Sequence, residues 1–193
     1  MTKETLTVLG AGSWGTALSI VLADNGHNVR LWSYSKEQVE KINKTNMNED
    51  YLPNVLLPKS IHAYDNLAEA VNGVKIVVVA VPTKAIREVM QKLIQHLIDP
   101  VTIVHVCKGI EPGSLKRVSE MITEEVPDEL LKDIVVLSGP SHAEEVSIHH
   151  PTTVVVSSKN LQSCEMVQDL FMNPNFRVYT NPDVVGVELG GAL

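Results

Sequence analysis

Short β-branched runs alternate with helix-like segments along almost the whole chain, and this alternation is what most restricts its fold. The longest such run, residues 74–81, is apolar except for Lys75. A strand of that composition has to be covered on both faces, since a strand with one wet face would alternate apolar and polar residues. Repeated strand–helix units therefore predict an α/β fold with a doubly wound, mainly parallel sheet and helices on both faces.

The predicted elements follow from these runs and from the prolines and glycines between them. Strands are expected at residues 6–10, 28–33, 61–64, 74–81, 101–107, 134–137, 152–157 and 176–180. Helices are expected at residues 14–25, 36–43, 66–71, 84–96, 114–126, 141–147 and 161–172. Residues 45–60, with Pro53 and Pro58, are expected to form a loop.

A glycine-rich segment, Gly10-Ala-Gly12-Ser-Trp-Gly15, joins the first predicted strand to the first predicted helix. Gly10 allows a tight turn, Gly12 lets the backbone approach a pyrophosphate, and Gly15 permits close helix–strand packing. Unpaired N–H groups at the helix N-terminus attract the anion. In this position the motif predicts a Rossmann-like domain that binds a dinucleotide.

The end of the second predicted strand bears on the choice between NADP and NAD. An acidic residue there would bind the ribose 2′-hydroxyl and repel a 2′-phosphate, yet no carboxylate occurs before Glu37. Tyr34, two serines and Lys36 favour NADP(H) instead. NAD(H) stays open, because Tyr34 and Lys36 are equally well explained as solvated loop residues.

Two further strand ends are candidate site positions. Pro82 follows the predicted strand 74–81, where a cofactor contact and a simple helix start are alternative interpretations. Lys108 follows the next strand and precedes Gly109, so its ammonium is expected at the ligand edge of the sheet. A lysine there can hold a phosphate or polarise a hydroxyl or carbonyl oxygen, the alternative being a solvated loop lysine. The neighbouring Cys107 is expected in the core.

The segment Ser138-Gly-Pro-Ser141-His142 follows another predicted strand. Gly139 and Ser141 offer backbone and hydroxyl donors to an anion at a helix start. His142 is a candidate proton carrier, although a structural or solvated role is favoured. No cysteine or aspartate stands at ligand spacing from His149 and His150, so no metal site is expected.

Composition excludes several classes of protein. The 44% hydrophobic and 20% charged residues argue against disorder, and a net charge of −7 argues against a nucleic-acid partner. The longest apolar run has six residues, too short for a membrane span, and no signal peptide precedes the glycine-rich segment. Two cysteines cannot form a disulfide framework. A cytoplasmic protein is expected.

With these motifs placed, the chain resembles the bacterial NAD(P)-dependent glycerol-3-phosphate dehydrogenase family over essentially all 193 residues. The resemblance rests on several motifs in order, at residues 10–17, 51–53, 80–83, 107–110, 137–145, 179–183 and 187–193. Several motifs in one order are far more specific than a glycine-rich loop alone.

The resemblance implies hydride transfer between NAD(P)H and dihydroxyacetone phosphate, giving glycerol 3-phosphate for phospholipid synthesis. It implies dinucleotide contacts at Ser13, Trp14, Tyr34, Tyr51 and Ala143. Lys108 matches the lysine near both nicotinamide and substrate, and Gly139 and Ser141 match substrate-side positions. The implied partner is thus a small phosphorylated molecule, with a homodimer expected at full length.

The resemblance also implies a domain division. Residues 1–186 correspond to the dinucleotide-binding domain, and residues 187–193 to the start of a helical substrate domain. In the family a lysine, the general base, follows directly after the position of Leu193. The chain is therefore expected to be a truncated piece that binds cofactor without catalysing the reaction.

Two alternatives stay open. One is a related dehydrogenase of the 3-hydroxyacid type, against which the phosphate-suited residues 138–141 and Lys108 argue. The other is a redox-sensing Rossmann module without catalysis, which would need a DNA-binding or partner domain that the sequence does not show.

Overall fold

An eight-stranded sheet forms the centre of the computed structural model, which describes residues 3–191. Its strand order is β10-β9-β8-β7-β6-β1-β2-β5, and all pairs are parallel except β8–β9. The strands are β1 (Thr5–Leu9), β2 (Asn28–Trp32), β5 (Ile61–Tyr64), β6 (Ile76–Val79), β7 (Val101–His105), β8 (Leu131–Ser138), β9 (Thr152–Ser157) and β10 (Phe176–Thr180). The predicted mainly parallel, doubly wound α/β fold is confirmed.

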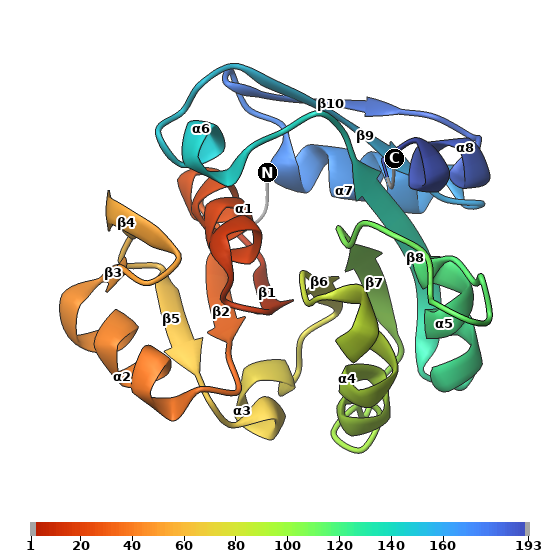
Figure 1. Cartoon of the computed structure of the whole chain (residues 1–193), viewed down its shortest axis with the longest axis horizontal. Helices are drawn as coiled ribbons and strands as arrows, with labels where there is room; N and C mark the ends of the chain where they lie inside the picture. The colour runs from red at the N-terminus through yellow and green to blue at the C-terminus, as the bar shows by residue number, and fades with distance from the viewer. Residues whose placement is uncertain (1–2, 192–193) are drawn as a thin grey trace.

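Helices cover both faces of this sheet, as Figure 1 shows, with α1, α6 and α7 on one side and α3, α4 and α5 on the other. The helices are α1 (Ser13–Asp24), α2 (Lys36–Thr45), α3 (Leu67–Val71), the 3-10 turn η1 (Thr83–Ala85), α4 (Ile86–Leu93), α5 (Val118–Glu125), α6 (Ala143–Ser147), α7 (Leu161–Phe171) and α8 (Val184–Gly190). No helix within residues 3–191 has the length and apolar character that crossing a membrane requires.

Strand β6 shows why the apolar run had to be continuous. Ile76 and Val78 face the core that contains α1 and α7, whereas Val77 and Val79 face the core that contains α3, α4 and α5. All four side chains are buried, because successive residues of a strand point to opposite faces and both faces are covered.

The structure differs from the predicted elements mainly in two segments. Residues 45–60 contain a hairpin of β3 (Met47–Asn48) and β4 (Leu52–Leu56), not only a loop. Pro53 is tolerated there because this two-stranded sheet has free edges. Helix α5 begins at Val118 rather than at residue 114, since Leu115 has a left-handed backbone (φ 59°) that a helix excludes.

The backbones of β1, α1 and the segment after β6 approach one another closely. The strand order reverses between β1 and β6, so their carboxyl ends open a crevice. Gly10 has a φ of 112°, and a Cβ there would overlap the Ala80 carbonyl. A Cβ on Gly15 would overlap the carbonyl oxygen of Gly10, so α1 can start this close to β1 only with glycine.

We therefore expect Gly15→Ala to lower the free energy of unfolding by about 3 kcal/mol, because the backbone of Gly10 has to move. Urea denaturation of both chains measures the difference. Gly12→Ala is the matched control: a Cβ there meets nothing within 4 Å. It should cost less than about 1 kcal/mol. Equal stability of Gly15→Ala and the unchanged chain would show that this contact does not restrict the fold.

Candidate functional site

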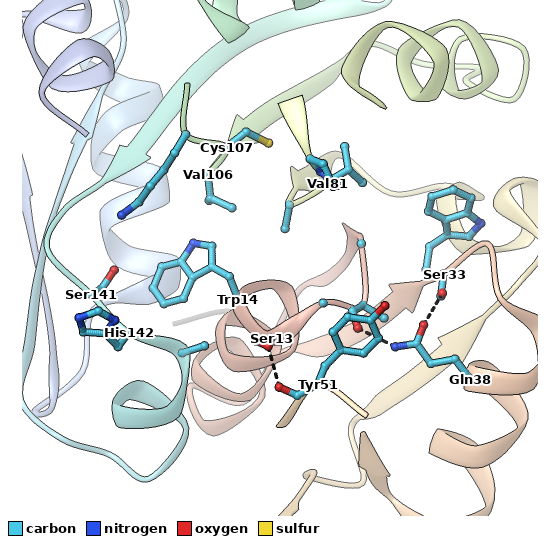
Figure 2. Close-up of a pocket in the computed structure, with 18 of the residues that line it drawn as sticks. Ser13, Trp14, Ser33, Gln38, Tyr51, Val81, Val106, Cys107, Ser141 and His142 are labelled. Carbon is cyan, nitrogen blue, oxygen red and sulfur yellow. Dashed lines mark hydrogen bonds between the residues drawn. The ribbon is translucent and has the colours of Figure 1, made fainter. Parts of the chain in front are cut away.

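A cavity of about 530 Å³ lies at the carboxyl ends of β1, β2, β6 and β7. Figure 2 shows Ser33, Gln38 and Tyr51 at one end of this cavity and Ser141 and His142 at the other, with Trp14 between them. Parallel strands bring their carboxyl ends to one edge, and the reversal of strand order leaves room between the loops that follow them.

The N-terminus of α1 forms part of the cavity wall. Gly12 is its N-cap residue, no side chain caps the helix, and the first turn contains no acidic residue. The first N–H groups and the positive end of the helix dipole therefore remain available to an anion. The Ser13 hydroxyl is already used, since it donates to the Tyr51 carbonyl oxygen at 2.6 Å.

At the end of β2, the two serines differ in their surroundings. Ser33 is buried and donates through its hydroxyl to Gln38 Oε1 at 2.6 Å. Ser35 caps α2 by accepting from the Gln38 backbone N–H. Tyr34 is 85% exposed, and Lys36 is exposed as well, with its ammonium 3.9 Å from the exposed Glu40 carboxylate of the same helix, so both side chains are accessible to a ligand.

Lys108 lies where two cavities meet. It lines the cavity described above and also a second one of about 400 Å³. Its carbonyl oxygen accepts from Thr83 Oγ1 at 2.6 Å, and Gly109 follows with a φ of 111°. Among residues 3–191 no carboxylate lies within 4.0 Å of its ammonium, which can therefore pair with a ligand oxygen.

The loop that carries Lys108 is anchored by a charge network. Arg87 on α4 contacts Glu111 of the loop at 2.6 Å, and it also contacts Glu124 and Glu125 of α5 at 2.9 and 2.7 Å. Hydrogen bonds from Arg87 and Ser114 lower the pKa of Glu111 to about 2, so this carboxylate stays ionised at neutral pH. The network ties the loop to two helices, which limits where Lys108 can move.

Helix α8 lines the second cavity and is held in place through a buried carboxylate. Glu188 accepts from the Ser119 N–H at 2.8 Å, from the Ser119 hydroxyl at 2.7 Å and from Arg117 at 2.7 Å. His105 Nε2 lies 3.4 Å from the same carboxylate. Burial lowers the pKa of His105 well below its ordinary value, so the ring is neutral at pH 7.

The structure brings most of the residues predicted from sequence to the first cavity. Those that line it are Gly10, Gly12, Ser13, Trp14, Tyr34, Tyr51, Pro82, Lys108, Ser141 and Ala143. Gly15 lies beneath the loop in the packing contact, and Gly139 lines the second cavity instead. Ser141 and Gly139, predicted as one anion site, thus line different cavities, and Lys108 lines both.

Sequence reasoning missed Gln38, which lines the first cavity, and Glu188, which holds α8. The sequence signal for both was a polar side chain at a position of the helix that faces the core: the amide of Gln38 in α2 and the carboxylate of Glu188 in α8. The predicted start of a second domain at residue 187 falls inside α8, and Ala192 and Leu193 lie outside the described residues.

Comparison with known proteins identifies what the chain is similar to. Residues 5–164 match the family model described as NAD-dependent glycerol-3-phosphate dehydrogenase N-terminus. A curated protein from Geobacillus thermodenitrificans, named glycerol-3-phosphate dehydrogenase (NAD(P)+), is 65% identical over 98% of this chain and 55% of its own length. A protein of the same name from Bacillus anthracis is 58% identical over 100% of this chain and 56% of its own length.

Solved structures show the same likeness. The crystal structure of glycerol-3-phosphate dehydrogenase from Coxiella burnetii is 37% identical with a TM-score of 0.90, over 98% of this chain and 57% of that one. A pyrroline-5-carboxylate reductase from the same organism, at 12% identity and a TM-score of 0.71, shares only the fold. The chain thus spans about half the length of the curated relatives it matches.

Cys107 provides a test of the site geometry. The residue is partly buried and lines the first cavity, so the prediction that it lies in the core is wrong. Its thiol donates to the Val79 carbonyl oxygen at 3.2 Å, and burial raises its pKa to about 12. Only the thiolate reacts, so at pH 8 iodoacetamide should alkylate Cys107 at least about 100-fold more slowly than an unfolded thiol. Peptide mass spectrometry measures the rate, and the urea-unfolded chain is the control. Rapid labelling of folded protein would mean that the thiol faces solvent.

Proposed function

Because the chain belongs to the NAD-dependent glycerol-3-phosphate dehydrogenase family, whose N-terminal part it matches, we propose that it is the dinucleotide-binding part of such an enzyme. The observation that carries the proposal is the uncapped N-terminus of α1, which faces a cavity at the point where the strand order reverses. That is where a doubly wound sheet binds a dinucleotide.

The described residues fit a nicotinamide dinucleotide. The pyrophosphate is proposed to bind at the N-terminus of α1, where Gly12 adds no side chain and the first N–H groups are available to an anion. The adenosine half is proposed to lie beside Tyr34 and the end of β2, and the nicotinamide half beside Pro82 and Lys108, all of which line the cavity. When bound, the nicotinamide ring supplies the hydride that the reaction transfers.

Residues of the chain supply orientation and charge. Lys108 lies between the two cavities, so its ammonium is proposed to hold the substrate oxygen beside the cofactor. Gly139 and Ser141 are proposed on the substrate side. The base that takes the C2 hydroxyl proton is proposed, from the family resemblance, to follow Leu193, with residues 187–193 leading into a helical substrate domain.

For the cofactor we propose NADP(H), with NAD(H) as the weaker ligand. Support comes from the end of β2, where Tyr34 and Lys36 are exposed and the cavity-lining residues Trp32, Ser33 and Tyr34 include no carboxylate; the acidic residue in the lining, Glu144, comes from α6. A 2′-phosphate there would meet a cation rather than a carboxylate. The proposed setting is a cytoplasmic enzyme acting on dihydroxyacetone phosphate or glycerol 3-phosphate, dimeric at full length and without a nucleic-acid or membrane partner.

Calorimetric titration of the chain with NADPH and with NADH tests the binding proposal directly. NADPH should bind more tightly than NADH. Lys36→Ala should weaken NADPH binding about 3- to 10-fold while leaving the affinity for NADH unchanged, because an exposed ion pair contributes roughly 1 kcal/mol. Lys44→Ala, at the other end of α2, is the matched control. The absence of binding by both cofactors would exclude the proposal, and an equal loss for both would exclude a 2′-phosphate contact at Lys36.

A second test concerns Lys108 in the full-length enzyme. Lys108→Ala should lower kcat by about 100-fold or more, because one donor to the reacting oxygen is lost. The Kd of the cofactor should change less than about 3-fold, since Lys108 is proposed to hold the substrate oxygen, whereas the cofactor phosphates are proposed to bind at the N-terminus of α1 and at the end of β2.

Lys84→Ala is the control for this measurement, because Lys84 lies on η1 and lines neither cavity. Unchanged steady-state turnover of Lys108→Ala would remove this lysine from the site.

A further inference from the structure

Two buried amides converge on one carbonyl oxygen of the glycine loop. Gln38 of α2 donates through Nε2 to the Ala11 oxygen at 2.7 Å, and Asn48 of β3 donates through Nδ2 to the same oxygen at 2.9 Å. The two side chains are 8% and 2% exposed. A carbonyl oxygen has two lone pairs, so this one receives its full complement of donors.

The rest of the amide network fixes which way each amide points. Gln38 Oε1 accepts from the Ser33 hydroxyl at 2.6 Å, while its Nε2 also reaches Asn48 Oδ1 at 3.1 Å. Asn48 Nδ2 also donates to Thr16 Oγ1 at 2.8 Å. Because Ala11 O can only accept, both nitrogens have to face it, and the oxygens of both amides have other partners.

The position of the Ala11 oxygen determines the direction of the next N–H. In a trans peptide the carbonyl and the following N–H lie in one plane and point in opposite directions. With the Ala11 oxygen held toward α2 and β3, the Gly12 N–H points to the other side of the loop. Gly12 lines the cavity, and within residues 3–191 no backbone oxygen accepts its N–H.

We infer that Gln38 and Asn48 are positioning residues for cofactor binding: by holding the Ala11 oxygen, they direct the Gly12 N–H toward the bound pyrophosphate. The inference rests on the proposed dinucleotide site and adds to it two side chains from outside the glycine motif. One of them, Asn48, lies in the hairpin and does not line the cavity itself.

The chemistry of the contact supports positioning over simple packing. Elsewhere α2 packs through Val39 and Ile42, which are buried at no polar cost. Two amides at a buried contact must first be desolvated, and they recover that cost only through well-aligned hydrogen bonds. Such a contact therefore specifies the orientation of its acceptor, which apolar side chains cannot do.

The test compares Asn48→Ala and Gln38→Met with a matched control in the same segment. Asn43 also joins α2 to a backbone, through paired 2.9 Å hydrogen bonds with Ala63 of β5, and it lies away from the glycine loop. Asn43→Ala therefore removes a comparable amide–backbone contact without touching Ala11. For each chain we would measure the Kd of NADPH by calorimetry, urea stability, and the Gly12 amide signal in ¹H–¹⁵N spectra.

We expect Asn48→Ala and Gln38→Met each to weaken NADPH binding about 3- to 10-fold, because each removes one of the two hydrogen bonds that hold the Ala11 oxygen. Asn43→Ala should change the Kd less than about 2-fold. The NADPH-induced shift of the Gly12 amide should shrink only in the first two variants. Gln38 lines the cavity, so a loss in Asn48→Ala distinguishes positioning from lost direct contact. If Asn48→Ala does not fold, the NADPH-induced shift of the Gly12 amide in Gln38→Met tests the inference: a smaller shift supports it and an unchanged shift contradicts it.

Wild-type affinity in Asn48→Ala, or an equal loss in Asn43→Ala, would overturn the inference while leaving the dinucleotide site in place. An unchanged Gly12 shift in both loop variants would also overturn it. Failure of the unchanged chain to bind NADPH or NADH at millimolar concentration would instead overturn the proposed function, and the inference with it.

Discussion

The close approach of the first turn of α1 to the ends of β1 and β6 is the constraint on which the rest of this domain depends. The backbone around Gly10 and Gly15 leaves no room for a Cβ, so both positions require glycine, although glycine loses more conformational entropy on folding than any other residue. The result is a helix N-terminus brought directly over the crevice at the reversal of strand order. Anion binding, the placement of Trp14 and the shape of the cavity all follow from that position.

A second group of interactions, made by side chains outside the first cavity, holds the segments that carry cavity-lining residues. Arg87 ties the loop after β7 to α4 and α5, and Glu188 ties α8 to Arg117 and Ser119. Lys108 thereby stands between two cavities while its own charge is left unpaired among the described residues. Ion pairs serve the site here by limiting the movement of a loop that carries a functional ammonium.

Sequence reasoning succeeded where one local pattern dictated one structure. The apolar run at residues 74–81 required a strand covered on both faces, and β6 is buried throughout. It failed at the hairpin of β3 and β4, where two prolines predicted a loop. The pairing of these strands is short, and Asn48 in β3 is held by hydrogen bonds to Ala11 and Thr16, which are distant in the sequence. It also failed at the start of α5, because the left-handed Leu115 depends on a loop held by Arg87 and Glu111 rather than on the local sequence.

The sequence by itself determined the fold class, the position of the glycine loop and the family to which the chain belongs, because each rests on residue types at fixed spacing. Only the tertiary structure decided that Ser141 and Gly139 line different cavities and that Lys108 reaches both. It alone showed that Gln38 and Asn48 meet at the Ala11 oxygen. Ala11 is 27 and 37 residues away from these two amides, and hydrogen bonds over such separations follow no sequence periodicity from which they can be predicted.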